Sequence, residues 1–177
     1  MTPYEEFLEL SHQIGLVNGY LVTPLSQMSD SQRRPIDRVN DTALIVSHVF
    51  ALEDLCSHYI SRSASRKGSL NSKLLKKLAW EAAEAERLDE AMPRFRVVDE
   101  VMMIRDLCAH GLGRRKPLAV PTRLTPRLLR SYGFETDGRE DDLEARWWPK
   151  REPAFSACVS PLTDLARWVA QNLRLQQ

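Results

Sequence analysis

Apolar residues recur at helical spacing through most of this chain, and that pattern sets the strongest limit on its fold. The longest run extends from Asp37 to about Ser61, roughly seven turns of helix. Its apolar residues are Ala43, Leu44, Ile45, Val46, Val49, Phe50, Leu52, Leu55 and Tyr59. A helix of this length with one apolar side needs neighbouring helices to cover that side. We therefore expect it to be the central helix of a bundle.

The same spacing predicts further helices over residues 5–25, 70–92, 94–110 and 161–175. Pro93 separates the third helix from the fourth, and Gly111 follows the fourth at a position where helices commonly stop. Strand-like alternation is scarce and no repeat is present. The sequence thus predicts an all-α fold, an up-and-down bundle of four to five helices that forms one domain over residues 1–177.

The stretch from 113 to 156 lacks a long helical pattern and is predicted to be an insertion before the last helix. It begins with a basic, proline-bearing segment over 113–121 and continues with a short helix around 126–132. An acidic, turn-rich stretch over 135–144 follows. Residues 145–155 are then expected to form a short hairpin.

The balance of charges excludes a strong overall field. With 25 Lys and Arg against 24 Asp and Glu the formal net charge is +1, so any nucleic-acid contact needs a local basic patch. No apolar window is long enough for a membrane helix, and the first residues are acidic where a signal peptide is basic and then apolar. We expect a soluble protein of the cytoplasm.

The three cysteines, Cys56, Cys108 and Cys158, are widely spaced in apolar segments. An odd number in such surroundings favours reduced thiols in the core over disulfides. The chain has no Cys-x-x-Cys or His-x-x-x-His pair of the kind that holds zinc. We expect no metal and no cofactor.

Chemistry-bearing residues gather at the end of the fourth predicted helix. Asp106 and His110 are four residues apart and can touch on one side of a helix, whereas Arg105 and His110 are about 140° apart around its axis. A site that uses both therefore needs the helix to end at His110 or a second copy to approach. Val98, Met102 and Met103 border this edge, so we expect it to be buried in a homodimer.

The end of the fourth predicted helix resembles the signature of the HEPN superfamily. That signature is an Arg, a polar residue, three further residues and a His at the end of a helix in a small bundle. The matching residues are Arg105, Asp106 and His110. The long preceding helix, the glycine after the His and the closing helix add to the resemblance. It implies a metal-independent endoribonuclease, often a toxin or an abortive-infection (antiviral defence) component, whose Arg and His face those of a second protomer.

The resemblance implies a catalytic role for each of the three residues. His110 would give and take protons, Arg105 would hold the phosphate, and Asp106 would orient the imidazole or tune its pKa. In one subset of the family a Tyr two residues after the His is modified by a partner antitoxin. That position is Leu112 here, so such a partner acting at that residue is not expected.

Other residues have two interpretations each. The basic run Arg114, Arg115 and Lys116 either guides RNA toward His110 or is a solvated loop. Glu53 either pairs with Arg105 or belongs to a solvated face, and the paired tryptophans Trp147 and Trp148 either stack on bases or pack a hairpin onto the bundle.

His48 and His58 are interpreted as core or surface histidines, and Met102 and Met103 as core or interface residues. The alternative to the nuclease is a non-catalytic HEPN-like module that binds nucleotides or a regulatory protein. In that case Arg105 pairs with an acid and His110 simply ends the helix. A helix-turn-helix DNA binder is not favoured, because the sequence contains no short recognition helix with a basic first turn.

Overall fold

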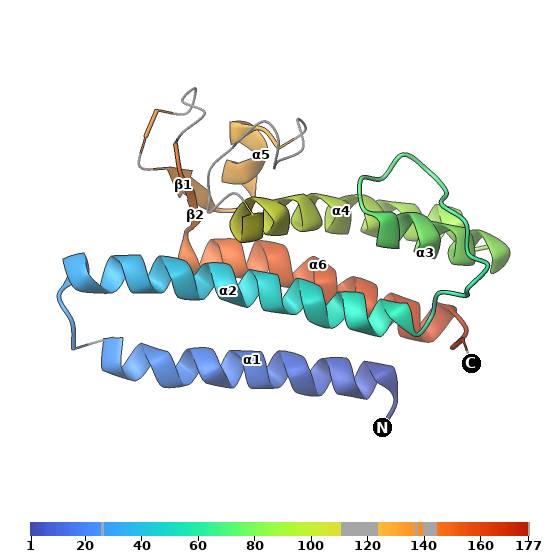
Figure 1. Cartoon of the computed structure of the whole chain (residues 1–177), viewed down its shortest axis with the longest axis horizontal. Helices are drawn as coiled ribbons and strands as arrows, with labels where there is room; N and C mark the ends of the chain where they lie inside the picture. Colours follow the sequence, from blue (N-terminus) through green and yellow to red (C-terminus); the bar gives the residue numbers. More distant parts are fainter. Residues whose placement is uncertain (26, 111–123, 137, 140–144, 177) are drawn as a thin grey trace.

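The computed structural model describes residues 1–25, 27–110, 124–136, 138–139 and 145–176. Within these ranges six helices and one two-stranded sheet are present (Figure 1). The helices are α1 (Pro3–Leu25), α2 (Asp30–Ser57), α3 (Lys73–Glu84), α4 (Leu88–His110), α5 (Pro126–Ser131) and α6 (Arg151–Asn172). The mainly helical class is confirmed, and the short α5 is the helix predicted around 126–132 within the insertion.

The long helices run alternately up and down, and α2 lies at the centre in contact with α1, α4 and α6 (Figure 1). The shorter α3 lies beside α4. Most of the apolar side of α2 predicted from the sequence forms the middle of the core, where Ile45, Leu52 and Leu55 are buried. Ala43 and Phe50 were predicted on that side but are exposed. All three cysteines are buried free thiols, as predicted, and burial raises the pKa of Cys108 to about 12.

The start of α2 differs from the prediction. The helix begins at Asp30, seven residues earlier than expected. Ser29 precedes it, and Oε1 of Gln32 accepts from both the backbone N–H and the hydroxyl of Ser29. This Ser-x-x-Gln pattern is a helix start, and it outweighs Pro35, which the first turns of α2 accommodate.

The boundary between α3 and α4 also differs from the prediction, which placed it at Pro93. The break lies at 85–87, where Glu86 has a left-handed φ of 57°. The N–H of Glu86 donates to the carbonyl of Ala83, and that of Arg87 to the carbonyl of Ala82. This pattern ends helices and is usually built on glycine, so its glutamate was not recognisable as a stop.

The last helix begins ten residues before Pro161, where the prediction placed its start. The buried residues Ala154, Cys158, Leu162 and Leu165 keep helical spacing across the proline, so burial outweighs the lost N–H. The segment between α4 and α6 therefore ends at Lys150.

The expected hairpin over 145–155 is replaced by a different strand pair. Strand β2 (Trp147–Pro149) pairs antiparallel with β1 (Phe134–Thr136). Gly133 leads into β1 with a left-handed φ of 74°, and a Cβ there would lie 2.7 Å from the backbone nitrogen of Ala154. Only glycine fits this approach of the sheet to α6.

Candidate active site

The predicted motif lies in the last two turns of α4, where α4 faces α2 and the loop before α3. This half of α4 is fixed because its inner side is buried in the bundle. Its buried apolar residues are Val98, Val101, Met102, Met103, Ile104, Leu107 and Cys108. Arg105 and Asp106 are only partly buried and line a pocket, and His110 is the last residue of the helix.

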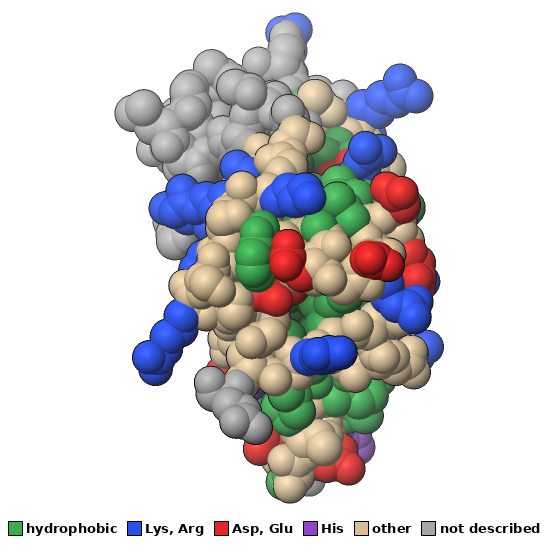
Figure 2. All heavy atoms as spheres, turned by 90° about the vertical axis from the view of Figure 1, so that its right-hand side faces the viewer, with side chains coloured by type: hydrophobic (Ala, Val, Ile, Leu, Met, Phe, Trp, Pro, Cys, Tyr) green, Lys and Arg blue, Asp and Glu red, His purple; other side chains and the backbone are tan. Residues whose placement is uncertain are grey.

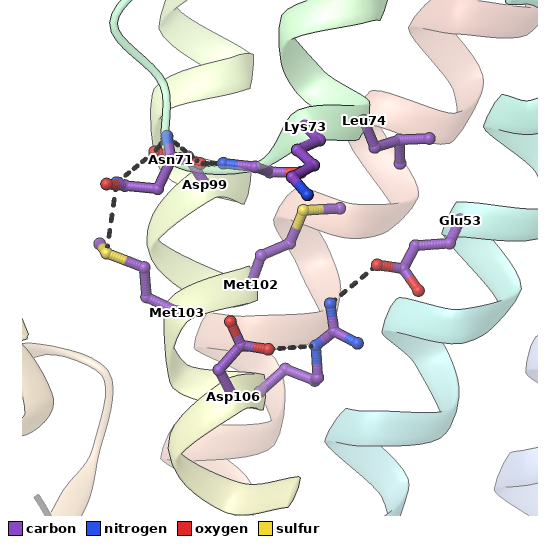
Figure 3. Close-up of a pocket in the computed structure, with 10 residues that line it drawn as sticks. Glu53, Asn71, Lys73, Leu74, Asp99, Met102, Met103 and Asp106 are labelled. Atoms are coloured by element: carbon purple, nitrogen blue, oxygen red, sulfur yellow. Dashed lines mark hydrogen bonds and ion pairs between the residues drawn. The ribbon is translucent and has the colours of Figure 1, made fainter. Parts of the chain in front are cut away.

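Two carboxylates from different helices hold the guanidinium of Arg105 (Figure 3). Its Nη2 donates to Oε1 of Glu53 on α2 over 2.8 Å. Its Nε lies 3.0 Å from Oδ1 of Asp106, as an ion pair rather than an aligned hydrogen bond. The guanidinium carbon lies 5.4 Å from the ring centroid of Phe50, within cation–π range. Of the two interpretations of Glu53, the structure shows the pairing with Arg105.

The side chains of Arg105, Glu53 and Asp106 form a cluster whose partial exposure limits how much its ion pairs stabilise the fold. The Arg105 side chain is 15% exposed, and both carboxylates are more exposed than that. Ion pairs near the surface contribute roughly 1 kcal/mol or less, so these contacts orient the guanidinium more than they stabilise the fold. One positive charge is set against two negative charges. The cluster is therefore net negative before any ligand binds.

The cluster forms one side of a pocket of about 470 Å³ between α2, α4 and the start of α3. Its lining residues are Glu53, Asn71, Ser72, Lys73, Leu74, Asp99, Met102, Met103, Arg105 and Asp106. Figure 3 shows Lys73 and Leu74 across the pocket from Asp106. The pocket thus combines two cationic side chains, carboxylates and apolar side chains, which suits a ligand with both polar and apolar parts.

Asp99 shapes this pocket, a role that was not predicted from the sequence. Its carboxylate is buried and accepts from the backbone N–H of Asn71 and Ser72 at 2.8–3.0 Å and from the amide of Asn71 at 2.8 Å. These contacts tie the loop before α3 to α4. The sequence did contain a signal for this role. Asp99 lies among apolar residues of α4, and a carboxylate buried there needs hydrogen-bond partners.

Two groups of predicted site residues cannot be compared with this geometry. The side chain of His110 and the whole of Arg114, Arg115 and Lys116 lie outside the described part of the chain. The contact expected between Asp106 and His110 therefore stays a prediction. The described structure places Arg105 and Asp106 together at 3.0 Å and locates the backbone of His110 at the end of the same helix.

One step of the dimer prediction is wrong. Val98, Met102 and Met103 were expected to border an edge that a second copy covers. All three are buried within the core of the single chain, because α4 rotates that side toward the bundle. They are core residues, one of the two roles proposed for the methionines. They therefore give no apolar contact to a second copy, and the homodimer itself stays a prediction.

The other candidates have structural roles. Trp147 is buried under the sheet, which agrees with packing rather than base stacking. Trp148 is half-buried, with the guanidinium carbons of Arg38 and Arg146 at 5.3 and 6.0 Å from its ring. His58 is exposed. His48 is buried, donates from Nδ1 to the carbonyl of Leu44 over 2.8 Å and meets Phe155 edge-on.

His48 makes stability depend on pH. Burial lowers its pKa below the ordinary 6.5, and the hydrogen bond to Leu44 only partly opposes this. Below pH 6.5 the unfolded chain takes up a proton that the folded chain refuses, so stability falls as pH falls toward the folded pKa. We expect a slope of up to about 1.4 kcal/mol per pH unit from this residue.

The measurement is urea unfolding at about pH 7.5 and about pH 5.5. His48→Asn keeps a donor near Leu44 but does not titrate, and it should lose less stability between the two values than the wild type. His58→Asn, at an exposed position, is the matched control and should behave as the wild type. Equal losses in the wild type and His48→Asn would contradict the prediction.

In comparisons with protein-family models, with curated proteins and with solved structures, nothing matches this chain. Among the described residues no helix is long and apolar enough to cross a membrane. The same part of the chain holds no group of three or more His, Cys, Asp or Glu side chains arranged to bind a metal. The Arg105 pocket is therefore the feature of this chain that points to a function.

Proposed function

We propose that this protein is a metal-independent endoribonuclease of HEPN type, a toxin or antiviral defence component that cleaves RNA at a site shared by two protomers. The observation that carries the proposal is the oriented guanidinium of Arg105 at the edge of a pocket, five residues before the helix end at His110. An arginine and a histidine supply charge stabilisation and proton transfer, which are the two needs of phosphodiester cleavage.

Arg105 holds a phosphate oxygen in this mechanism. Glu53 and Asp106 engage Nη2 and Nε, and Nη1 meets no acceptor among the described residues. A phosphate can therefore bind at Nη1 while Glu53 keeps the planar fork in position. The negative charge of the two carboxylates also weakens ground-state binding of the phosphate. They also oppose the charge that develops in the transition state, so stabilisation of that charge rests on the direct contact with Nη1.

His110 moves the protons. As a base it takes the proton of the ribose 2′-hydroxyl, whose oxygen attacks the adjacent phosphorus. The bond from phosphorus to the 5′ oxygen breaks, and a protonated histidine returns a proton to that oxygen. The products are a 2′,3′-cyclic phosphate and a 5′-hydroxyl. A histidine suits both steps because its ordinary pKa lies near neutral pH.

The basic run Arg114, Arg115 and Lys116 is proposed to bind the RNA backbone beyond the site. The end of the molecule that lies away from the last turn of α4 offers little basic surface for binding RNA. Figure 2 shows Lys and Arg side chains there separated by Asp and Glu and by apolar side chains, so the described residues on that face form no continuous basic surface. Backbone binding by a local run also agrees with the formal net charge of +1.

A non-catalytic module that binds nucleotides or a regulatory protein, such as an antitoxin, is the second candidate. The pairing of Arg105 with Glu53 and Asp106 favours it, because an arginine neutralised by acids is also what a structural role produces. The two functions differ in a single readout. The module binds without cutting, whereas the nuclease cuts.

Cleavage is expected to persist in excess EDTA, because side chains supply the acid, base and charge stabilisation. The purified protein is incubated with a panel of cellular RNAs, with and without EDTA, and the cut ends are analysed for cyclic phosphate. A magnesium-dependent nuclease in the same assay is the control. Activity that EDTA abolishes and magnesium restores would overturn the mechanism. Binding without any cleavage would favour the module.

A further inference from the structure

Helix α2 carries an apolar stripe that stays exposed in the described part of the chain. Ile36, Val39 and Phe50 are 41%, 65% and 53% exposed, Ala43 is exposed and Val46 is half-buried. Their spacing of three, four, three and four residues places them on one line along the helix. This spacing is the seam by which one helix packs against another. The buried side of α2 uses other residues, so the stripe is additional to the core.

The stripe has a hollow at one end and a large side chain at the other. The hollow is an apolar groove of about 470 Å³, lined by Pro35, Ile36, Val39, Asn40 and Ala43. The side chain is Phe50, which stands about two turns beyond Ala43 along the helix. A knob and a hole on one surface patch, placed on either side of a small residue, are self-complementary.

We propose that a second copy of this chain packs on this stripe, with the two α2 helices antiparallel about a twofold axis at Ala43. Phe50 and Ile36 each lie seven residues from Ala43, so Phe50 of each copy enters the groove at Ile36 of the other. The small Ala43 side chains meet at the axis, where two helices approach within the usual 8–10 Å.

The charges beside the stripe agree with the same pairing. Arg33 lies ten residues before Ala43, and Glu53 lies ten residues after it. In the antiparallel arrangement Arg33 of one copy lies at the same level along the helix as Glu53 of the other, at both ends of the interface. Both side chains are partly exposed and already have partners within their own chain, Asp37 and Arg105. A parallel pair would instead place like charges opposite one another, which disfavours it.

This inference rests on the proposed function only in giving the shared site its second protomer. Phe50 stacks on Arg105, so the second copy covers one side of that contact. Helix α4 runs opposite to α2, as Figure 1 shows, and Arg105 lies beside Glu53. The end of α4 at His110 therefore lies closer to the level of Ala43 than Arg105 does. The axis brings the two helix ends toward each other.

The first test is the mass in solution, measured by light scattering at tens of micromolar. The wild type should have twice the monomer mass of 20.3 kDa. Val39→Glu, which places a charge in the groove, should raise the dissociation constant on the order of a hundredfold or more. Val17→Glu on α1, at a valine that is 60% exposed, is the matched control and should stay dimeric. Circular dichroism verifies that both variants are folded.

The second test is crosslinking through introduced cysteines, which is selective because the three native thiols are buried. Ala43→Cys should form a disulfide with its own copy on oxidation, and Asp54→Cys should not. Crosslinking of both would mean a parallel pair and would overturn the proposal. A monomeric wild type, or a dimer that Val17→Glu breaks and Val39→Glu leaves intact, would also overturn it.

Cleavage separates this inference from the proposed function. A wild type that cuts RNA as a monomer overturns the α2 interface and leaves the nuclease standing without a shared site. A dimer that behaves as described but never cuts RNA supports the interface and overturns the nuclease.

Discussion

His110→Ala is expected to lower RNA cleavage by on the order of a hundredfold or more, while RNA affinity and folding stay close to those of the wild type. The substitution removes the group proposed to move protons and leaves the guanidinium of Arg105 in place. His110 is the last residue of α4, and alanine there retains full helix propensity. The measurement is single-turnover cleavage at saturating RNA, with affinity measured separately.

Two variants distinguish chemistry from binding. Arg105→Ala should reduce cleavage by a similar factor and also weaken the contact with phosphate. Changing Arg114, Arg115 and Lys116 together should lower affinity and flatten its salt dependence, because each lost phosphate contact releases fewer counterions. The chemical step at saturating RNA should change little in that triple variant. Equal cleavage by the wild type and His110→Ala would refute the assignment of His110.

Asp99→Ala is expected to destabilise the fold by about 3 kcal/mol, which lowers the melting temperature by about 6–12 °C for a domain of this size. The carboxylate is buried and accepts from the backbone N–H groups of Asn71 and Ser72 and from the Asn71 amide. A hydrogen bond to a charged group contributes roughly 1.5–3 kcal/mol. Asn71 is exposed, so water replaces part of the lost hydrogen bonding. The expected destabilisation is therefore smaller than the sum of the individual hydrogen-bond contributions.

Thermal and urea unfolding of Asp99→Ala measure this effect. Asp54→Ala removes an exposed carboxylate of α2 and is the matched control, with an expected change within about 0.5 kcal/mol. The loop before α3 also forms a wall of the Arg105 pocket, so ligand affinity should fall together with stability. A stability equal to that of Asp54→Ala would show that Asp99 does not anchor the loop.

The helical class was predictable because apolar spacing is a local property. The pattern identified α1 within two residues at its start, the buried side of α2, and the short α5, whose N-cap Thr125 accepts from the N–H of Leu128. The cysteines were predictable as core thiols for the same reason. The ends of the helices were less predictable. The start of α6 was placed at Pro161 although packing carries the helix through it, and Glu86 took a conformation usually left to glycine.

The candidate site divides in the same way. The sequence by itself determined that Arg105, Asp106 and His110 lie on the last turns of one helix, because residues near each other in the chain have positions set by helix geometry. Only the tertiary structure decided that Glu53, 52 residues away, is the partner of Arg105, and that Asp99 anchors Asn71. It also decided that Val98, Met102 and Met103 face the core and that the α2 stripe faces outward. The physical reason is that periodicity tells which residues share a side of a helix, whereas packing against other helices selects which side is buried.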